Sequence, residues 1–553
     1  MIGVVTRSED RDVVREFFEL FKTPWEFCRP DGRYEVLIDN GAASNDHLAK
    51  LVLVYGSQTT LFDHERKTLP GPPRGNVTLS HDGDRIPVYG RCLTFLSDDA
   101  SSSLIVENTL ESVVSVTRRD GSVFVRIGYD LFQEIGFLLT TGQPPAYAGI
   151  PTLERHIAFL RDCILSAGIP LVEIPPVPAG YRFIVCLTHD VDHPSIRLHK
   201  FDHTTAGFLY RAVVGSLIGL CTRRVRPATL RRNWTAALLL PFVHLGWAKD
   251  FWSGFDRYLE IDKGLGSTFF VIPVRNRPGR TVGGEAPAMR ASSYGVADIA
   301  PQVHTLLAAG SEIALHGIDA WLDSASGREE RELVSRVTGT STVGTRMHWL
   351  FWDDRAPERL EEAGFSYDST LGYNETVGFR TGTLQAFKPI TARHLLELPL
   401  IIMDTALFYP SYLNLTPDAA KEALRPLMDD AERYGGALTI NWHDRSLAPE
   451  RLWGEFYTEF VDELKRRTAW FPTVAQAVSW FRQRRSTVFD AVRWDGDSVH
   501  VTASADCCPG LPGLSVRVHA PWSGNGEDPS RRRRPARFVD VSFTNTVDAH
   551  VRF

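Results

Sequence analysis

Acidic and basic side chains stand at a few points of the sequence where they could carry out hydrolysis. Asp190 and Asp192 follow the apolar run RFIVCL, and one carboxylate could bind a cation while the other acts as a general base. His316 offers an imidazole ligand, and Arg346 offers a permanent positive charge that would keep the base ionised. His443 is a candidate proton donor. Together these residue types suffice for metal-assisted hydrolysis.

A repeated pattern of short apolar strand and amphipathic helix must position these residues. It begins at residue 182, with strands predicted at 182–187, 267–272, 311–315, 343–347, 365–368, 396–402 and 437–442, and helices at 252–263, 297–309, 327–337, 356–363, 417–434 and 450–467. Such alternation indicates a parallel sheet covered by helices, and this many units suit a barrel. Because the carboxyl ends of barrel strands line one mouth, the candidate residues are expected to meet there.

Each signal also has a structural interpretation. An Asp at a strand end often caps the next helix, and a single buried His is often structural. The ordered set of residues therefore carries the prediction, rather than any one of them.

That order resembles the polysaccharide deacetylase (NodB-homology) family. The similar segments are LTHDVD (187–192), TFFVIP (268–273), EIALHGIDAW (312–321), TRMHWLF (345–351), YDSTLGY (367–373) and LTINWHD (438–444). The resemblance implies an α/β fold, a distorted parallel (β/α) barrel, and a metal-dependent hydrolase acting on a carbon–nitrogen bond. The expected substrate is an acetylated glycan or sugar, N-acetyl before O-acetyl, and the expected cofactor is a divalent metal, zinc first.

The resemblance also assigns a role to each candidate residue. Asp190 would be the general base that activates water, and Arg346 would hold it ionised. His443 would be the general acid that protonates the leaving amine, or would stabilise the oxyanion. Asp192 and His316 would be metal ligands.

This chain departs from the family pattern at two positions. Four residues after His316, where the family has a second histidine ligand, stands Ala320. Asp319 is the nearest substitute as third ligand, and His193 is an alternative. In the segment that corresponds to R-x-P-Y, His348 replaces the proline, so the local loop need not keep the usual shape.

Two further residues near the predicted mouth have open roles. Asp404 follows the strand LELPLII and would either orient the His443 ring or cap a loop. Arg380 would either contact a sugar or lie on the surface.

The barrel is predicted at 179–485, between two flanking domains. Residues 1–178 are expected to form an α/β accessory domain of unknown role, with a helix at 152–167, and residues 486–553 a small β domain. Four prolines and a glycine within 169–182 favour an interdomain linker.

A long helical insertion at 193–250 carries five clustered arginines: Arg223, Arg224, Arg226, Arg231 and Arg232. It would either contact an anionic membrane surface or a lipid-linked glycan peripherally, or form a helical lid whose arginines are solvated. Its apolar stretches, 206–220 and 234–247, are short and interrupted by polar residues or proline, so we expect neither to span a bilayer.

Bulk properties restrict the partners. The net charge of −6 gives no reason to expect nucleic acid, and the start of the chain lacks a signal-peptide pattern. The seven scattered cysteines fit reduced thiols, so a cytoplasmic location is expected. The sequence does not determine an oligomeric state.

Two other functions compete with deacetylation. One is a non-catalytic carbohydrate-binding or polysaccharide-assembly module on a degenerate barrel. The other is a glycosidase that pairs Asp190 with Asp368 or Asp404, which would leave His316 and Arg346 unexplained.

Overall fold

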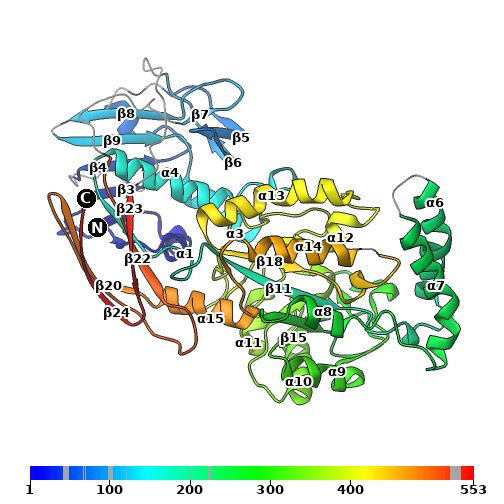
Figure 1. Cartoon of the computed structure of the whole chain (residues 1–553). Helices are drawn as coiled ribbons and strands as arrows, with labels where there is room; N and C mark the ends of the chain where they lie inside the picture. Colours follow the sequence, from blue (N-terminus) through cyan, green and yellow to red (C-terminus); the bar gives the residue numbers. More distant parts are fainter. Residues whose placement is uncertain are drawn as a thin grey trace.

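The fold is described by a computed structural model (Figure 1). The structure describes residues 1–553 except 41–48, 66–67, 69, 97–103, 120, 201, 222–225, 452 and 523–536, so Arg223 and Arg224 lie outside the described residues. In Figure 1 the two chain termini lie close together at one side, and helices α6 and α7 stand at the opposite side.

A parallel sheet forms the centre of the barrel. Its strands run in the order β16-β15-β12-β11-β18-β17, with β19 also paired to β11. Their bounds are β11 Phe183–Val191, β12 Ser267–Val271, β15 Glu312–Gly317, β16 Thr345–Met347, β17 Ile402–Met403, β18 Ala437–Asn441 and β19 Ala469–Trp470. Every residue of β11 is buried, as a central parallel strand requires.

The ring of strands is distorted where it closes. Residues 365–368 and 396–402 were expected to form two full strands, but single parallel bridges join Thr345 to Asp368 and Asp368 to Glu397, and regular pairing resumes only at β17. The predicted distorted parallel (β/α) barrel is confirmed.

Helices cover the outer face of this sheet and overlap the predicted ranges. They are α8 Phe255–Ile261, α9 Ala300–Ala308, α10 Ser324–Thr338, α11 Ala356–Ala363, α13 Pro417–Tyr434 and α14 Trp453–Lys465, followed by α15 Val474–Arg485. Local sequence fixes their starts: at α13, the Thr416 hydroxyl accepts from the Ala419 backbone N–H and Pro417 occupies the first turn. Their buried faces form one hydrophobic core with the strands.

The N-terminal domain has its own sheet, in the order β2-β1-β3-β4-β9-β8. The strands are β1 Ile2–Val5, β2 Trp25–Phe27, β3 Val36–Asp39, β4 Leu51–Tyr55, β8 Val114–Arg119 and β9 Ser122–Ile127, and the main helices are α1 Arg11–Phe21, α3 Leu131–Thr140 and α4 Thr152–Ser166. A second sheet contains β5 Arg74–His81, β6 Asp84–Cys92 and β7 Ile105–Val106. These elements agree with an α/β domain.

The C-terminal segment folds into β strands that pack against the rest of the chain. They are β20 Val488–Asp495, β21 Ser498–Ser504, β22 Leu514–His519, β23 Phe538–Phe543 and β24 Thr546–Arg552. Strand β10, Leu171–Glu173, lies in the expected linker and pairs antiparallel with β22. Arg484 also donates to the carbonyl groups of Leu20 and Ile174. Segment 169–182 is therefore an integral part of the fold and not a free linker.

The long insertion forms two adjacent helical stretches. The first comprises α5 His203–Leu209, the π-helical turn η4 Tyr210–Gly215 and α6 Ser216–Cys221; the second is α7 Pro227–His244. By length and composition, the stretch Thr204–Cys221 is long and apolar enough to cross a membrane. It is longer than the apolar segment 206–220 because the helical stretch begins at His203 and ends at Cys221.

Candidate active site

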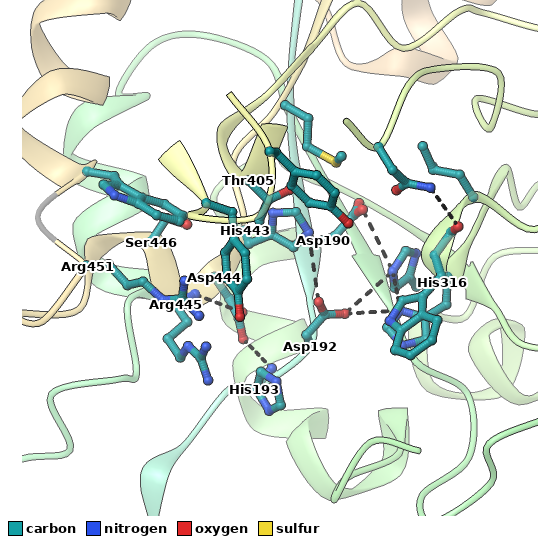
Figure 2. Close-up of a pocket in the computed structure, with 18 of the residues that line it drawn as sticks. Asp190, Asp192, His193, His316, Thr405, His443, Asp444, Arg445, Ser446 and Arg451 are labelled. Atoms are coloured by element: carbon teal, nitrogen blue, oxygen red, sulfur yellow. Dashed lines mark hydrogen bonds and ion pairs between the residues drawn. The ribbon is translucent and has the colours of Figure 1, made fainter. Parts of the chain in front are cut away.

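The strand ends bring the predicted residues to one cavity. Asp190 lies in β11 and Asp192 just after it, His316 lies in β15, and His443 follows β18. All four line a cavity of about 510 Å³. Figure 2 shows Asp192 between His443 on one side and His316 on the other.

Three ligand atoms face one another in this cavity. His316 Nε2 lies 3.5 Å from Asp192 Oδ1, and His348 Nδ1 lies 3.4 Å from the same oxygen. The two ring nitrogens are 3.0 Å apart. Ligand atoms of a tetrahedral zinc site are separated by about 3.3 Å, given zinc–nitrogen bonds of about 2.0–2.1 Å. The triangle formed by Asp192, His316 and His348 therefore has the dimensions of a metal site.

The outward nitrogens of the two imidazoles determine their tautomers. His316 Nδ1 lies 3.1 Å from the Arg346 carbonyl oxygen, and His348 Nε2 lies 3.1 Å from the Arg290 carbonyl oxygen. Because a carbonyl oxygen only accepts, these outward nitrogens carry protons, so the two nitrogens that face each other are the ones available to bind a cation. Burial lowers the pKa of His348 to about 3, so that ring is neutral near pH 7.

The arrangement is unfavourable without a cation. Two imidazole nitrogens face each other at 3.0 Å beside a carboxylate, and Asp192 Oδ1 is buried without a hydrogen-bond partner among the described residues. A buried, unpaired carboxylate oxygen is costly. A divalent metal ion would satisfy all three atoms at once, so the residues present fit such an ion.

Asp319, expected as third ligand, is placed elsewhere. Its carboxylate accepts from Arg277 Nη2 at 3.0 Å and from the Arg280 backbone N–H at 2.7 Å. Ala320 is fully buried in the hydrophobic core, so that position faces away from the cavity. His193, the alternative, lines the cavity, but its Nδ1 lies 3.2 Å from His199 Nε2. The geometry favours His348 over both.

Asp190 is held as a carboxylate by two donors. Arg346 Nη1 donates to Oδ1 at 2.9 Å, and Asn441 Nδ2 donates to Oδ2 at 2.7 Å. Burial raises the pKa of Asp190, but neighbouring His316 and Arg346 lower it further than burial raises it, so the net shift is downward. Arg346 is itself fully buried, and its other donors are used by Thr188 and Ser369. Arg346 thus keeps Asp190 ionised without entering the cavity.

His443 is held as a cation. Asp404 Oδ1 accepts from its Nδ1 at 2.6 Å, and Asp404 Oδ2 accepts from its backbone N–H at 2.8 Å. Burial lowers the pKa of His443, but the charge of Asp404 and this hydrogen bond outweigh it and raise the pKa to about 10. Of the two roles considered for Asp404, the structure shows the one that orients the imidazole. His443 Nε2 remains directed toward the cavity, 3.8 Å from Asp192 Oδ2.

Aromatic side chains line the outer part of the cavity: Trp349, Phe351, Tyr409, Tyr412 and Trp453. Trp349 and Leu350 adopt positive φ angles of 62° and 55°, which non-glycine residues rarely do. This strained turn directly follows His348, so the same turn places the His348 imidazole and the Trp349 side chain at the cavity. Arg380, considered as a sugar contact, instead donates to the Gly372 carbonyl oxygen at 3.0 Å.

Sequence reasoning assigned no site role to two residues. His348 was noted only as a replacement for proline, and Asn441 was read only as part of a strand. Asn441 stands at the end of β18, beside β11, and its register partner is Thr188. A polar residue at the end of an otherwise apolar strand was the available signal.

Comparison with known proteins gives matches among solved structures only. No protein-family description and no curated protein matches this chain. A putative polysaccharide deacetylase from Mycobacterium smegmatis is 21% identical, with 58% of this chain and 100% of that chain covered and a TM-score of 0.36. A probable polysaccharide deacetylase from Pseudomonas aeruginosa PAO1 is 16% identical (56% and 94% covered, TM-score 0.34), and Puue allantoinase is 15% identical (55% and 92% covered, TM-score 0.33).

The fold class expected from the sequence is shown by the strand order itself. The chain has a distorted parallel (β/α) barrel, with further sheets before and after it in the sequence. The chemical role of each residue rests on the geometry of the site itself.

Proposed function

We propose that this protein is a divergent polysaccharide deacetylase, a hydrolase that removes acetyl groups, N-acetyl before O-acetyl, from a carbohydrate. The observation that carries the proposal is the triangle of Asp192, His316 and His348, flanked by an arginine-held carboxylate and a carboxylate-held imidazole. The site thus combines three residues that could bind a cation with a base, Asp190, and an acid, His443, neither of which has to bind that cation.

A bound divalent cation, zinc first, would polarise the acetyl carbonyl group and increase the acidity of water. Asp192, His316 and His348 would hold it, which supersedes Asp319 as the proposed third ligand. The backbone carbonyl groups of Arg346 and Arg290 fix both imidazoles in the tautomers that coordination requires.

The protein's own residues move the protons. Asp190 accepts a proton from the attacking water, whose oxygen bonds to the acetyl carbon, while Arg346 and Asn441 keep the carboxylate in place. His443 then donates its Nε2 proton to the leaving nitrogen as the carbon–nitrogen bond breaks. Acetate and a free amine result, and Asp404 stabilises the imidazolium until it reacts.

The aromatic lining supports a sugar as substrate. Flat aromatic faces beside a polar centre suit pyranose rings, which present apolar C–H surfaces and polar edges. A glycosidase is less well supported because its candidate second carboxylates are engaged: Asp404 binds His443, and Asp368 accepts from Thr370 and Ser369. Asp368 is not among the residues that line the cavity.

Acetate release from a panel of N- and O-acetylated glycans is the decisive assay. Protein stripped with a chelator should release little acetate, and added zinc or another divalent ion should restore the release. Reducing sugar without acetate would indicate a glycosidase. Glycan binding without turnover in metal-loaded protein would indicate a non-catalytic module.

The Asp404→Asn variant tests how His443 is kept protonated. A raised pKa means that the acid is present below about pH 10 and is lost as the pH rises through that value. Losing a charged hydrogen bond should lower the pKa of His443, and therefore the basic limb of the kcat profile, by about 1–2 pH units. The profile of Asp319→Asn should overlay the wild type. An unmoved basic limb in Asp404→Asn would exclude His443 as the acid.

A further inference from the structure

The described part of the insertion forms a pair of neighbouring helical stretches, called the helical hairpin here and defined as residues 203–221 and 226–248. The Asn233 amide donates to the Ser216 hydroxyl at 2.7 Å, and the Trp234 indole donates to the Val213 carbonyl oxygen at 3.4 Å. These contacts hold α7 against α6 and η4. Figure 1 shows α6 and α7 side by side at the edge of the molecule, on the side away from both chain termini.

The inner face of the hairpin is a small apolar core. Phe208, Ala212, Ala236, Leu240 and Val243 are buried together. These residues fill the contact between the two helices, so no other face of the hairpin is needed to hold the helices together. Any further apolar residues on it need a different explanation.

The outer faces of the helical hairpin are also apolar. Leu238 and Trp247 are each 75% exposed, the highest values in the hairpin. The other exposed large apolar residues are Leu209, Tyr210, Val213, Val214, Leu217, Ile218, Trp234, Leu239, Phe242 and Leu245. A lid in contact with water would have a polar outer face, so this surface indicates an apolar partner.

The charge of the same segment is of one sign. Between Asp202 and Asp250 the sequence has no Asp or Glu, but it has six arginines and Lys249. The side chains of Arg226, Arg231 and Arg232 are exposed, and among the described residues their only ion pair is the 3.5 Å contact of Arg232 with exposed Glu455. The partner must therefore present both an apolar region and negatively charged groups.

We propose that the helical hairpin docks on the surface of an anionic lipid bilayer. The exposed aliphatic and aromatic side chains enter the boundary between headgroups and acyl chains, and the arginines pair with lipid phosphates. A second copy of this chain is a less suitable partner than an anionic bilayer. Its net charge is only −6, and it does not combine dense negative charge with an adjoining apolar layer. The inference goes beyond the proposed deacetylation and does not depend on it.

The base of the hairpin adjoins the active-site cavity. Arg445, which lines the cavity, lies over the Trp252 ring at 4.7 Å, and Trp252 contacts Phe208 of α5 with ring centroids 6.1 Å apart. Docking would therefore hold the cavity close to the lipid surface, where a membrane-borne glycan is accessible.

Vesicle sedimentation of the full chain tests the proposal. Vesicles of phosphatidylcholine mixed with phosphatidylglycerol should pellet the protein, and pure phosphatidylcholine should pellet far less. Leu238→Glu with Trp247→Glu should abolish binding. Replacing Arg226, Arg231 and Arg232 with Glu should weaken it by at least about 100-fold, since each basic residue near an anionic surface contributes about 5-fold.

Matched controls replace residues of equal exposure elsewhere. Leu96 and Val282, each 79% exposed, are changed to Glu, and exposed Arg328, Arg355 and Arg493 form the control for the arginines. Both controls should bind vesicles like the wild type. All these side chains are exposed, so unfolding temperatures should be unchanged.

Three results would overturn the proposal. The first is wild-type protein that stays in the supernatant with anionic vesicles. The second is hairpin variants that bind as well as their controls. The third is a wild-type dimer, seen by light scattering, that the Leu238→Glu, Trp247→Glu double variant dissociates while vesicles bind neither form; a second copy would then be the occupant. Deacetylase activity enters none of these readouts.

Discussion

Replacement of Asp190 with Asn is expected to lower kcat for acetate release by at least about 100-fold, the usual scale of a lost general base. The amide has nearly the same shape but cannot take a proton from water. Metal content should stay unchanged, because Asp190 is not part of the ligand triangle. Steady-state kinetics together with metal analysis of the purified variant measure both quantities.

Asp319→Asn provides the matched control for this experiment. Asp319 is also a buried aspartate paired with an arginine, at 3.0 Å from Arg277, but it lies outside the residues that line the cavity. Both substitutions leave an arginine without its charged partner, so both should lower the unfolding temperature to a comparable extent. A specific loss of kcat in Asp190→Asn identifies the base. Equal kcat in the two variants would remove Asp190 from that role.

The barrel could be predicted because its strands are local, continuous and apolar. Each residue of β11 is buried, and chemically active residues follow directly at its end. The rule that carboxyl ends of parallel strands converge then brings together Asp190, His316 and His443 without knowledge of the tertiary structure.

His348, the proposed third ligand, could not be predicted because the family pattern compares positions within one segment. The H-x-x-x-H spacing directs attention to Ala320 and Asp319. In the structure, register pairs Gly317 with Met347, so the residue after β16, His348, reaches His316 from the neighbouring strand. When two neighbouring strands each supply one residue, no fixed spacing between those residues appears in the sequence of either strand.

Non-local pairing also explains the other discrepancies. Prolines in 169–182 favour a linker, but β10 gains its hydrogen bonds from β22, far away in the sequence. For the insertion, the sequence leaves both a helical lid and a peripheral membrane contact open. Only the three-dimensional packing shows that Leu238 and Trp247 stay exposed after the inner face is filled.

Replacement of His348 with Ala is expected to weaken zinc binding by at least about 100-fold, because loss of a direct ligand should exceed the 10- to 100-fold effect of losing an outer partner. Asp192→Ala and His316→Ala should behave alike, since each removes one corner of the same triangle. Competition with a chelating dye measures the affinity. Asp319→Ala is the comparison, and its affinity should match the wild type because its carboxylate binds Arg277 and the Arg280 backbone.

Unfolding temperatures separate this effect from simple loss of structure. Zinc should raise the unfolding temperature of the wild type, since a ligand that binds only the folded state stabilises it. In His348→Ala that rise should disappear. Without metal, the variant should lose only the stability that the cavity left by the missing ring costs, relative to the metal-free wild type. If instead His348→Ala retains zinc and Asp319→Ala loses it, the carboxylate must rotate away from Arg277 on binding, and Asp319 is the third ligand.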